Sequence, residues 1–208
     1  RHEWRTPLTI IMGASEVLAS QLADDSHLSE FTNRISNTAK ETSEIITALL
    51  LLSRAPEKLD TPHTSINNIA VNEAERLKYL LRYKSVTCTV VAEQEYFAYV
   101  RPELLKMALG NLIKNAFQYT DDGEVIISID AEKITVTDTG LGIPEAMMPL
   151  LYERFERLEL PHNDKQSDKI EGTGLGLSIV QRIMTHMGWK LTHQANTTGG
   201  STFSIYYQ

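Results

Sequence analysis

The sequence predicts an α+β protein in two parts, a helical hairpin that dimerises into a four-helix bundle and an α/β sandwich. Three observations support this prediction. Residues 1–55 carry apolar side chains at heptad spacing, residues 56–63 contain prolines without periodicity, and residues 64–208 alternate helical with strand-like patterns. We therefore expect a helical domain, a linker and a second domain with these boundaries.

The composition is that of a folded chain, with 42% hydrophobic and 23% charged residues among 208. A formal net charge of −7 argues against binding nucleic acid through the phosphate backbone, which requires clustered Lys and Arg. The single cysteine, Cys88, cannot form an internal disulfide. The longest apolar run, residues 45–52, is shorter than the roughly 18 residues of a membrane helix. Because the chain begins at Arg1 inside a motif, we expect it to be part of a longer protein.

The first part contains two series of residues with the spacing of bundle helices, separated by the polar residues 24–26. The series are Trp4, Leu8, Ile11, Ser15, Leu18 and Leu22, and then Leu28, Phe31, Ile35, Thr38, Thr42, Ile45, Leu49 and Leu52. Two helices alone cannot bury both apolar stripes, so the pattern favours dimerisation into a four-helix bundle.

The second part begins with a helical pattern over residues 67–84 and strand-like runs over 86–92 and 96–100. Pro102 occupies the favoured first-turn position of a helix over residues 102–119. Strand-like runs follow at 124–129 and 133–138, then an irregular stretch, a helix from about residue 174, and closing strands at 189–194 and 201–207. Helices mixed with hairpins in this way are typical of an α/β sandwich.

Polar residues gather on one face of the helix over residues 102–119. Asn111 and Asn115 are four residues apart and share a face, which Gln118 and Tyr119 continue. A carboxamide oxygen is a ligand for Mg²⁺, and a neighbouring aromatic ring suits a nucleotide base. Two exposed asparagines without a functional role would show the same spacing.

Two glycine-containing segments are candidate nucleotide-binding loops. Residues 138–144, DTGLGIP, end a strand, and a buried Asp138 there can accept a hydrogen bond from an amino group such as that of adenine. Residues 172–180, GTGLGLSIV, open a helix whose bare backbone N–H groups suit phosphate. Taken alone, each segment is also explained by ordinary turn chemistry. A Rossmann interpretation fails because a charged loop, and not a strand, precedes the second segment.

The order of these segments is more specific than any one of them. The chain resembles the ATP-binding domain of sensor histidine kinases in the order of four segments. They are an Asn-x-x-x-Asn helix, D-x-G-x-G, a charged stretch with YERFER at 152–157, and G-x-G-x-G. That domain belongs to a superfamily that includes gyrase, heat-shock chaperone and mismatch-repair ATPases. With HEWRTP at residues 2–7, the resemblance covers nearly the whole chain. It implies a Bergerat-type fold, a mixed and mostly antiparallel sheet with helices on one face.

The resemblance implies a role for each motif residue. Asn115 would coordinate Mg²⁺ with support from Asn111, Tyr119 would lie near the adenine, and Asp138 would accept from its amino group. The other expected ATP-binding residues are Gln118, Gly140, Gly142, Ile143, Phe155, Arg157, Gly172, Thr173, Gly174, Leu175, Gly176 and Leu177. Residues 157–171 would form a lid in which Arg157 contacts phosphate. Gln118 departs from the lysine that family members often carry near the phosphates. Either the missing charge weakens nucleotide binding, or Lys114, Lys165 or Lys169 substitutes for it.

His2-Glu3-x-x-Thr6-Pro7 resembles the phosphoacceptor box of the same family. On a helix, His2 lies nearly opposite the apolar seam and faces outward, where a lone histidine is most often simply solvated. The resemblance implies that Nε2 of His2 attacks the γ-phosphorus of ATP while Glu3 hydrogen-bonds to Nδ1. Thr6 fits the position that orients a water for dephosphorylating the response regulator.

The expected protein is therefore a homodimeric histidine kinase core that uses ATP and Mg²⁺ and transfers phosphate to an aspartate of a response-regulator receiver domain. We expect no nucleic-acid partner and a cytoplasmic location, with membrane attachment only through segments outside this chain. The alternatives are a conformational ATPase and a catalytically weak dimeric scaffold. The ATPases carry a water-activating glutamate where this chain has Asn111, and intact Asn115 and Asp138 argue against the scaffold.

Overall fold

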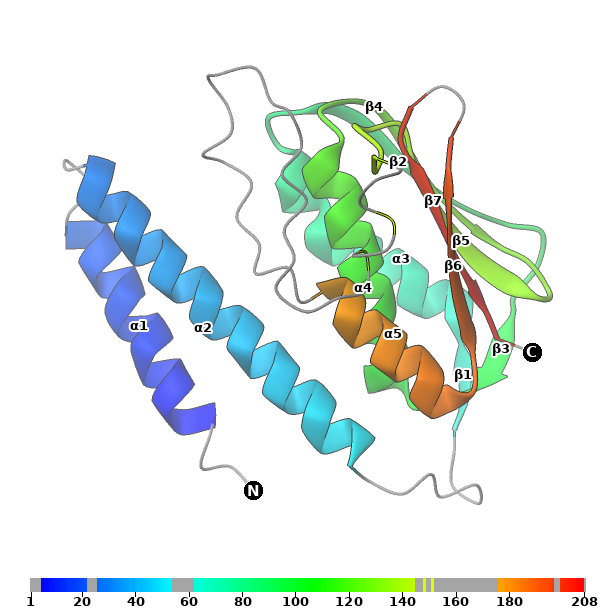
Figure 1. Cartoon of the computed structure of the whole chain (residues 1–208), viewed down its shortest axis with the longest axis horizontal. Coiled ribbons are helices and arrows are strands. Elements are labelled where there is room, and N and C mark those ends of the chain that lie inside the picture. The colour runs from blue at the N-terminus through cyan, green and yellow to red at the C-terminus, as the bar shows by residue number, and fades with distance from the viewer. Residues whose placement is uncertain are drawn as a thin grey trace. The chain divides into compact units, whose positions relative to one another are not determined.

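The computed structural model describes residues 5–21, 26–53, 62–144, 148, 151, 176–196 and 199–207 (Figure 1). The first two helices belong to one compact unit, and the sheet with its helices belongs to another. Within the described residues, no helix combines the length and the apolar character that crossing a membrane requires.

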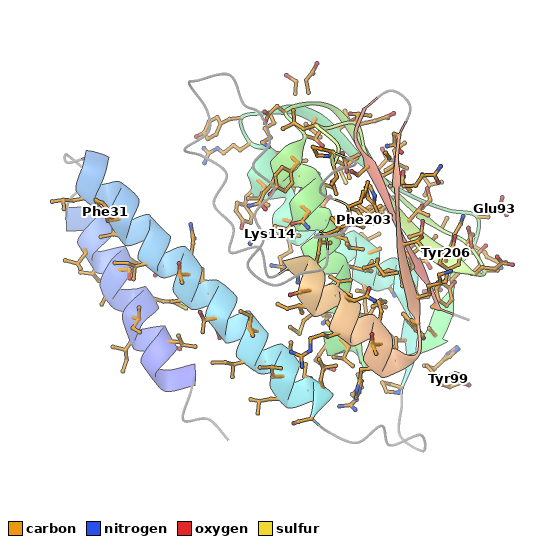
Figure 2. All side chains as sticks on the ribbon, viewed as in Figure 1. Phe31, Glu93, Tyr99, Lys114, Phe203 and Tyr206 are labelled. Carbon is orange, nitrogen blue, oxygen red and sulfur yellow. The ribbon has the colours of Figure 1, made fainter. Side chains whose placement is uncertain are left out.

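The first unit contains a hairpin of two helices, α1 (Arg5–Gln21) and α2 (Ser26–Leu52). Among the hairpin residues whose side chains are described, the buried ones are small or polar, namely Ser15, Thr32, Ser36, Ala39 and Ala48. Large apolar residues of the heptad series stay exposed, including Phe31 (Figure 2) and Ile35, whose side chains are 56% and 50% exposed. One hairpin therefore does not bury its own apolar stripe.

The second unit contains every strand of the described residues. Its elements are β1 (His63–Ser65), α3 (Ile66–Leu77), the 3₁₀ turn η1 (Lys78–Leu81), β2 (Ser85–Ala92), β3 (Phe97–Tyr99), α4 (Pro102–Tyr119), β4 (Asp122–Ile129), β5 (Lys133–Asp138), α5 (Gly176–Met187), β6 (Lys190–Ala195) and β7 (Ser201–Tyr206). The main sheet has the strand order β2-β4-β5-β7-β6, and β1 pairs with β3 separately. Only the β2–β4 pair of the described main sheet is parallel, so the expectation of a mixed and mostly antiparallel sheet is confirmed.

The expected and observed elements agree best where one face is continuously buried. The ranges of α4 and β5 coincide with the predicted 102–119 and 133–138. The predicted helix over 67–84 is shorter, because the α-helix ends at Leu77 and one 3₁₀ turn follows. The strand β1 is not predicted by the sequence pattern. Its Thr64 hydroxyl donates to the carbonyl oxygen of Val100 at 2.7 Å, a contact between segments 36 residues apart.

The core lies between the sheet and helices α3, α4 and α5, which cover one face of the sheet (Figure 1). Alternate residues of β4 and β5 point toward these helices because side chains alternate between the faces of a strand. They are Val125, Ile127, Ile129, Ile134, Val136 and Asp138, and all are buried. The inward-facing series on β5 thus ends with a buried carboxylate, that of Asp138, so the end of this strand is a candidate functional site.

Candidate functional site

Four of the expected nucleotide-binding residues lie on α4. Asn111, Asn115, Gln118 and Tyr119 are all partly exposed, whereas the residues between them, such as Leu112 and Ile113, are buried. The helical period therefore gives α4 one apolar side toward the sheet and one accessible polar side. Lys114 is also on α4 and partly exposed (Figure 2), so of the three lysines considered as replacements it is the one that the structure describes.

Asn111 connects this polar side to the start of α5. Its Nδ2 donates to the carbonyl oxygen of Met107 at 2.8 Å, one turn earlier in α4. Its Oδ1 faces Gly176, where a Cβ atom would lie only 2.7 Å from that oxygen. The glycine at the beginning of α5 thus allows this helix to approach Asn111 closely, which brings the last residue of the second glycine motif to α4.

Asp138 is 6% exposed at the end of β5. Its Oδ1 accepts hydrogen bonds from the backbone N–H groups of Gly140 at 2.9 Å and Ser201 at 3.2 Å. Burial raises the pKa of the Asp138 carboxyl above its usual value, although these two N–H groups act in the opposite direction. Since both bonds from described residues end on Oδ1, the arrangement can use Oδ2 to accept a hydrogen from a ligand.

The loop after Asp138 is held against the end of α4. The N–H of Leu141 donates to the carbonyl oxygen of Tyr119 at 3.2 Å. A Cβ atom at Gly140 would collide with that same oxygen and lie 2.8 Å from Oγ1 of Thr120. Gly142 adopts a φ of +68°, a conformation that favours glycine. The two glycines are therefore required by contact and by backbone conformation, respectively.

The turn between β6 and β7 also supports Asp138, and sequence reasoning overlooks it. Nδ2 of Asn196 donates to the backbone carbonyl oxygen of Asp138 at 2.9 Å. Gly200, with a φ of +86°, lies so close that a Cβ atom there would collide with the same carbonyl oxygen. The sequence feature that could have indicated this turn is the glycine pair at 199–200, because glycine allows the backbone to come close to another segment.

Several expected site residues lie outside the described residues. They are His2, Glu3, Phe155, Arg157, Gly172, Thr173, Gly174 and Leu175. Thr6 belongs to the first turn of α1, and its side chain is not described. Ile143 follows Gly142 and is partly buried, and Leu177 in the first turn of α5 is partly exposed.

Two families of known proteins match parts of this chain. Residues 100–208 match the family of histidine kinase-, DNA gyrase B- and HSP90-like ATPases, and residues 1–58 match the His Kinase A (phospho-acceptor) domain. The sensor histidine kinase RppB of Synechocystis sp. is 31% identical over 98% of this chain and 46% of its own length.

Two solved structures have the same fold. ShkA in complex with AMPPNP matches 99% of this chain and 43% of its own, with a TM-score of 0.69 and 21% identity. The Acinetobacter baumannii histidine kinase AdeS matches 99% of this chain and 96% of its own, with a TM-score of 0.62 and 20% identity.

The fold and the site together define an ATP-binding domain of the Bergerat type. The chain belongs to the histidine kinase family of this ATPase superfamily and comprises the catalytic core of a two-component sensor histidine kinase. It spans about half or less of the length of the curated relatives that it matches, from 14% of one to 54% of another.

Proposed function

We propose that the chain phosphorylates His2 with ATP bound at the site between α4 and the Asp138 loop. The buried Asp138 carboxylate is the observation that supports this most strongly. Two backbone N–H groups fix its Oδ1, and no described residue donates a hydrogen bond to Oδ2. No described Lys, Arg or His forms an ion pair with this buried carboxylate. Burial without full hydrogen bonding costs folding free energy, so a ligand N–H such as the adenine amino group would complete the hydrogen bonding of Asp138.

The polar side of α4 suits the phosphates and a magnesium ion. Within the described residues there is no cluster of three or more His, Cys, Asp or Glu side chains that could hold a metal by itself. Mg²⁺ in nucleotide sites typically has few protein ligands and completes its coordination with phosphate oxygens and water, so an amide-only site fits it. Asn115 would bind the ion, and Asn111 would support Asn115. The bound ion would neutralise part of the negative charge of the phosphates.

The transfer itself would use the N-terminal motif. The Nε2 lone pair of His2 forms a bond to the γ-phosphorus while the bond from that phosphorus to the β,γ-bridging oxygen breaks, and ADP leaves with the electron pair. Glu3 accepts the hydrogen bond from Nδ1–H and stabilises the positive charge that develops on the ring. Such a reaction depends mainly on positioning and charge neutralisation.

Asn111 favours phosphoryl transfer over ATP hydrolysis. A hydrolase needs a base at this place to activate water, and an amide is not a base. Its Nδ2 is moreover engaged with the carbonyl oxygen of Met107, which fixes the orientation of the amide. Asn111 would therefore support ATP binding without activating a water molecule, so the γ-phosphoryl group remains available for transfer to His2.

The proposal extends to the partners. The exposed Leu28, Phe31, Ile35 and Leu49 on α2 would be covered by a second copy, which completes a four-helix bundle. The phosphoryl group would pass from His2 to an aspartate of a receiver domain. Thr6 would orient a water molecule that hydrolyses the aspartyl phosphate of that regulator and releases inorganic phosphate. We place this core in the cytoplasm, with any membrane attachment outside these 208 residues.

The test is incubation with γ-labelled ATP and Mg²⁺, comparing the chain with His2→Ala. The matched control is His63→Ala, because His63 is an exposed histidine on β1. We expect acid-labile, alkali-stable label on the wild type and on His63→Ala, and none on His2→Ala. Equal labelling of all three proteins would refute His2 as acceptor. Steady ATP hydrolysis with no bound label would instead support the ATPase alternative.

A further inference from the structure

Lys84 makes an unusual set of contacts at the end of α4. Its Nζ donates to the carbonyl oxygens of Phe117 at 2.7 Å, Gln118 at 2.8 Å and Thr120 at 3.0 Å. The same atom pairs with Oδ1 of Asp121 at 3.0 Å. The Lys84 side chain is 20% exposed, so these contacts are partly shielded from water.

The chemistry of these contacts is that of a helix C-terminus. The last carbonyl groups of a helix lack partners within it and carry a partial negative charge. The last turn of α4 contains no basic residue. An ammonium group has three N–H donors, and Lys84 supplies them to three carbonyl oxygens from the segment between η1 and β2.

The clamped carbonyl groups lie on both sides of Tyr119. Its own carbonyl oxygen is not among the Lys84 contacts and instead accepts the N–H of Leu141 in the Asp138 loop. A Cβ atom at Gly140 would collide with that same oxygen, so the loop and the end of α4 fit together with little tolerance. Lys84 thus holds the backbone that decides where the loop after Asp138 lies.

The first residue after Lys84 strengthens this connection. The N–H of Ser85 donates to the carbonyl oxygen of Asp121 at 3.0 Å, and Ser85 is paired with Asp122 at the start of the parallel β2–β4 pair. The clamp therefore joins the ends of α4, β2 and β4 at one point. Movement of this point would displace Gln118 and Tyr119 on one side and the Asp138 loop on the other.

We propose that Lys84 is a positioning residue for nucleotide binding: it fixes the end of α4 against the Asp138 loop without itself contacting the nucleotide. This inference rests on the proposed binding of ATP at that site. It predicts an effect of Lys84 on nucleotide affinity that exceeds the effect expected from lost stability alone.

The experiment compares Lys84→Met with two matched variants in the full chain. Lys78→Met removes a lysine whose ion pair with Glu75, at 3.0 Å, is exposed on both partners. Ile205→Val removes one methylene from a fully buried residue of β7 that pairs with Ile134, away from Asp138, and so lowers stability without touching the clamp. For each protein, we would measure thermal unfolding and the dissociation constant for a fluorescent ATP analogue with Mg²⁺. The binding measurements are made at a temperature well below the unfolding midpoint of every variant.

We expect Lys84→Met to raise the dissociation constant by roughly tenfold, which corresponds to about 1.4 kcal/mol. Lys78→Met and Ile205→Val should stay within about twofold of the wild type, since neither alters the α4 end. If Lys84→Met does not fold, Lys84→Gln replaces it under the same criteria, because the amide still donates hydrogen bonds but carries no charge.

Two results would overturn the inference while leaving the proposed function intact. One is wild-type affinity in the folded Lys84 variant, and the other is an equal loss of affinity in Ile205→Val. Absence of nucleotide binding by the wild-type chain would overturn the proposed function as well, so the two failures are distinguished by the wild-type measurement.

Discussion

The helical hairpin and the sheet unit bury different kinds of residue. In the hairpin, the contact between helices uses serine, threonine and alanine, and Phe31 and Ile35 remain exposed. In the sheet unit, many large apolar side chains are buried as well as small ones, and Leu105, Ile113 and Phe117 of α4 have no exposed surface. Burial of such side chains contributes about 1.5–3 kcal/mol each, so the sheet unit carries its own stability.

This difference teaches what each part needs in order to function. A binding site that must hold Asp138 and the α4 amides in place is built on a core complete within one chain. The hairpin exposes an apolar stripe that is far too regular to be incidental surface, so its stability should depend on a second copy. The following experiments test this contrast, from the largest expected effect to the smallest.

Leu105→Ala should strongly destabilise the sheet unit. Leu105 is fully buried on α4, and truncation of such a residue costs about 2–5 kcal/mol. Chemical denaturation followed at several protein concentrations should show the same loss at each. Val71→Ala on α3 is the control, because Val71 is exposed and its truncation should change stability by less than about 0.5 kcal/mol. A loss that depends on concentration would contradict a self-sufficient core.

Ile35→Asp should prevent the proposed dimerisation of the hairpin. The substitution places a charge in the apolar stripe of both copies, and we expect the dimer dissociation constant to rise at least ~100-fold, or about 2.7 kcal/mol. Sedimentation velocity measures the change, and Ile35→Leu, which keeps the apolar surface, should remain dimeric. If both variants sediment as the wild type does, another surface forms the dimer.

Asp138→Asn should weaken nucleotide binding without destabilising the fold. The pKa of Asp138 is raised in the folded chain by burial, so the stabilisation from its protonated form is present at low pH and lost as the pH rises through the folded-state pKa. Asparagine stays neutral, so the unfolding temperature at pH 7 should be equal or higher. We expect affinity for ATP to fall by about 10- to 100-fold, because an amide N–H₂ would face the adenine amino group.

The matched measurement for Asp138 is the same substitution at an exposed carboxylate, Asp130→Asn, in the turn between β4 and β5. Oδ1 of Asp130 accepts two backbone N–H groups, as an asparagine oxygen also can. Asp130→Asn should change nucleotide affinity less than Asp138→Asn does. Thermal unfolding of the wild type and of Asp138→Asn from pH 4 to 7 should show a difference in stability that changes with pH. A clear drop in its stability at pH 7 would show that the carboxylate is mainly structural.

Lys40→Met should have the smallest effect. Nζ of Lys40 lies 3.4 Å from Oε1 of Glu16 across the hairpin, and both side chains are largely exposed. Solvent and salt screen such a pair, which is worth less than about 1 kcal/mol. Thermal unfolding of the dimer at low and high salt should differ little from the wild type. A large loss would mean that this charge lies in a less solvated setting than the single hairpin shows.

The parts of the fold that could be predicted are those whose secondary structure shows as a periodic pattern in neighbouring residues. The buried stripe of α4 and the alternation of β5 are periodic in the sequence, so both elements have the predicted bounds. The end of the predicted helix at 67–84 is different, because lysine, tyrosine and leucine at 78–81 do not distinguish an α-helix from a 3₁₀ turn. The three-residue strand β1 is too short to show alternation.

The sequence by itself determined the two-part organisation, the main helices and strands and the family, because periodicity and motif order are properties of neighbouring residues. Only the tertiary structure decided that Asn196 and Ser201 hydrogen-bond to Asp138 and that Lys84 holds the end of α4. These contacts join segments 33 to 63 residues apart. They depend on how the turn and the helix end meet in space, which no local pattern records.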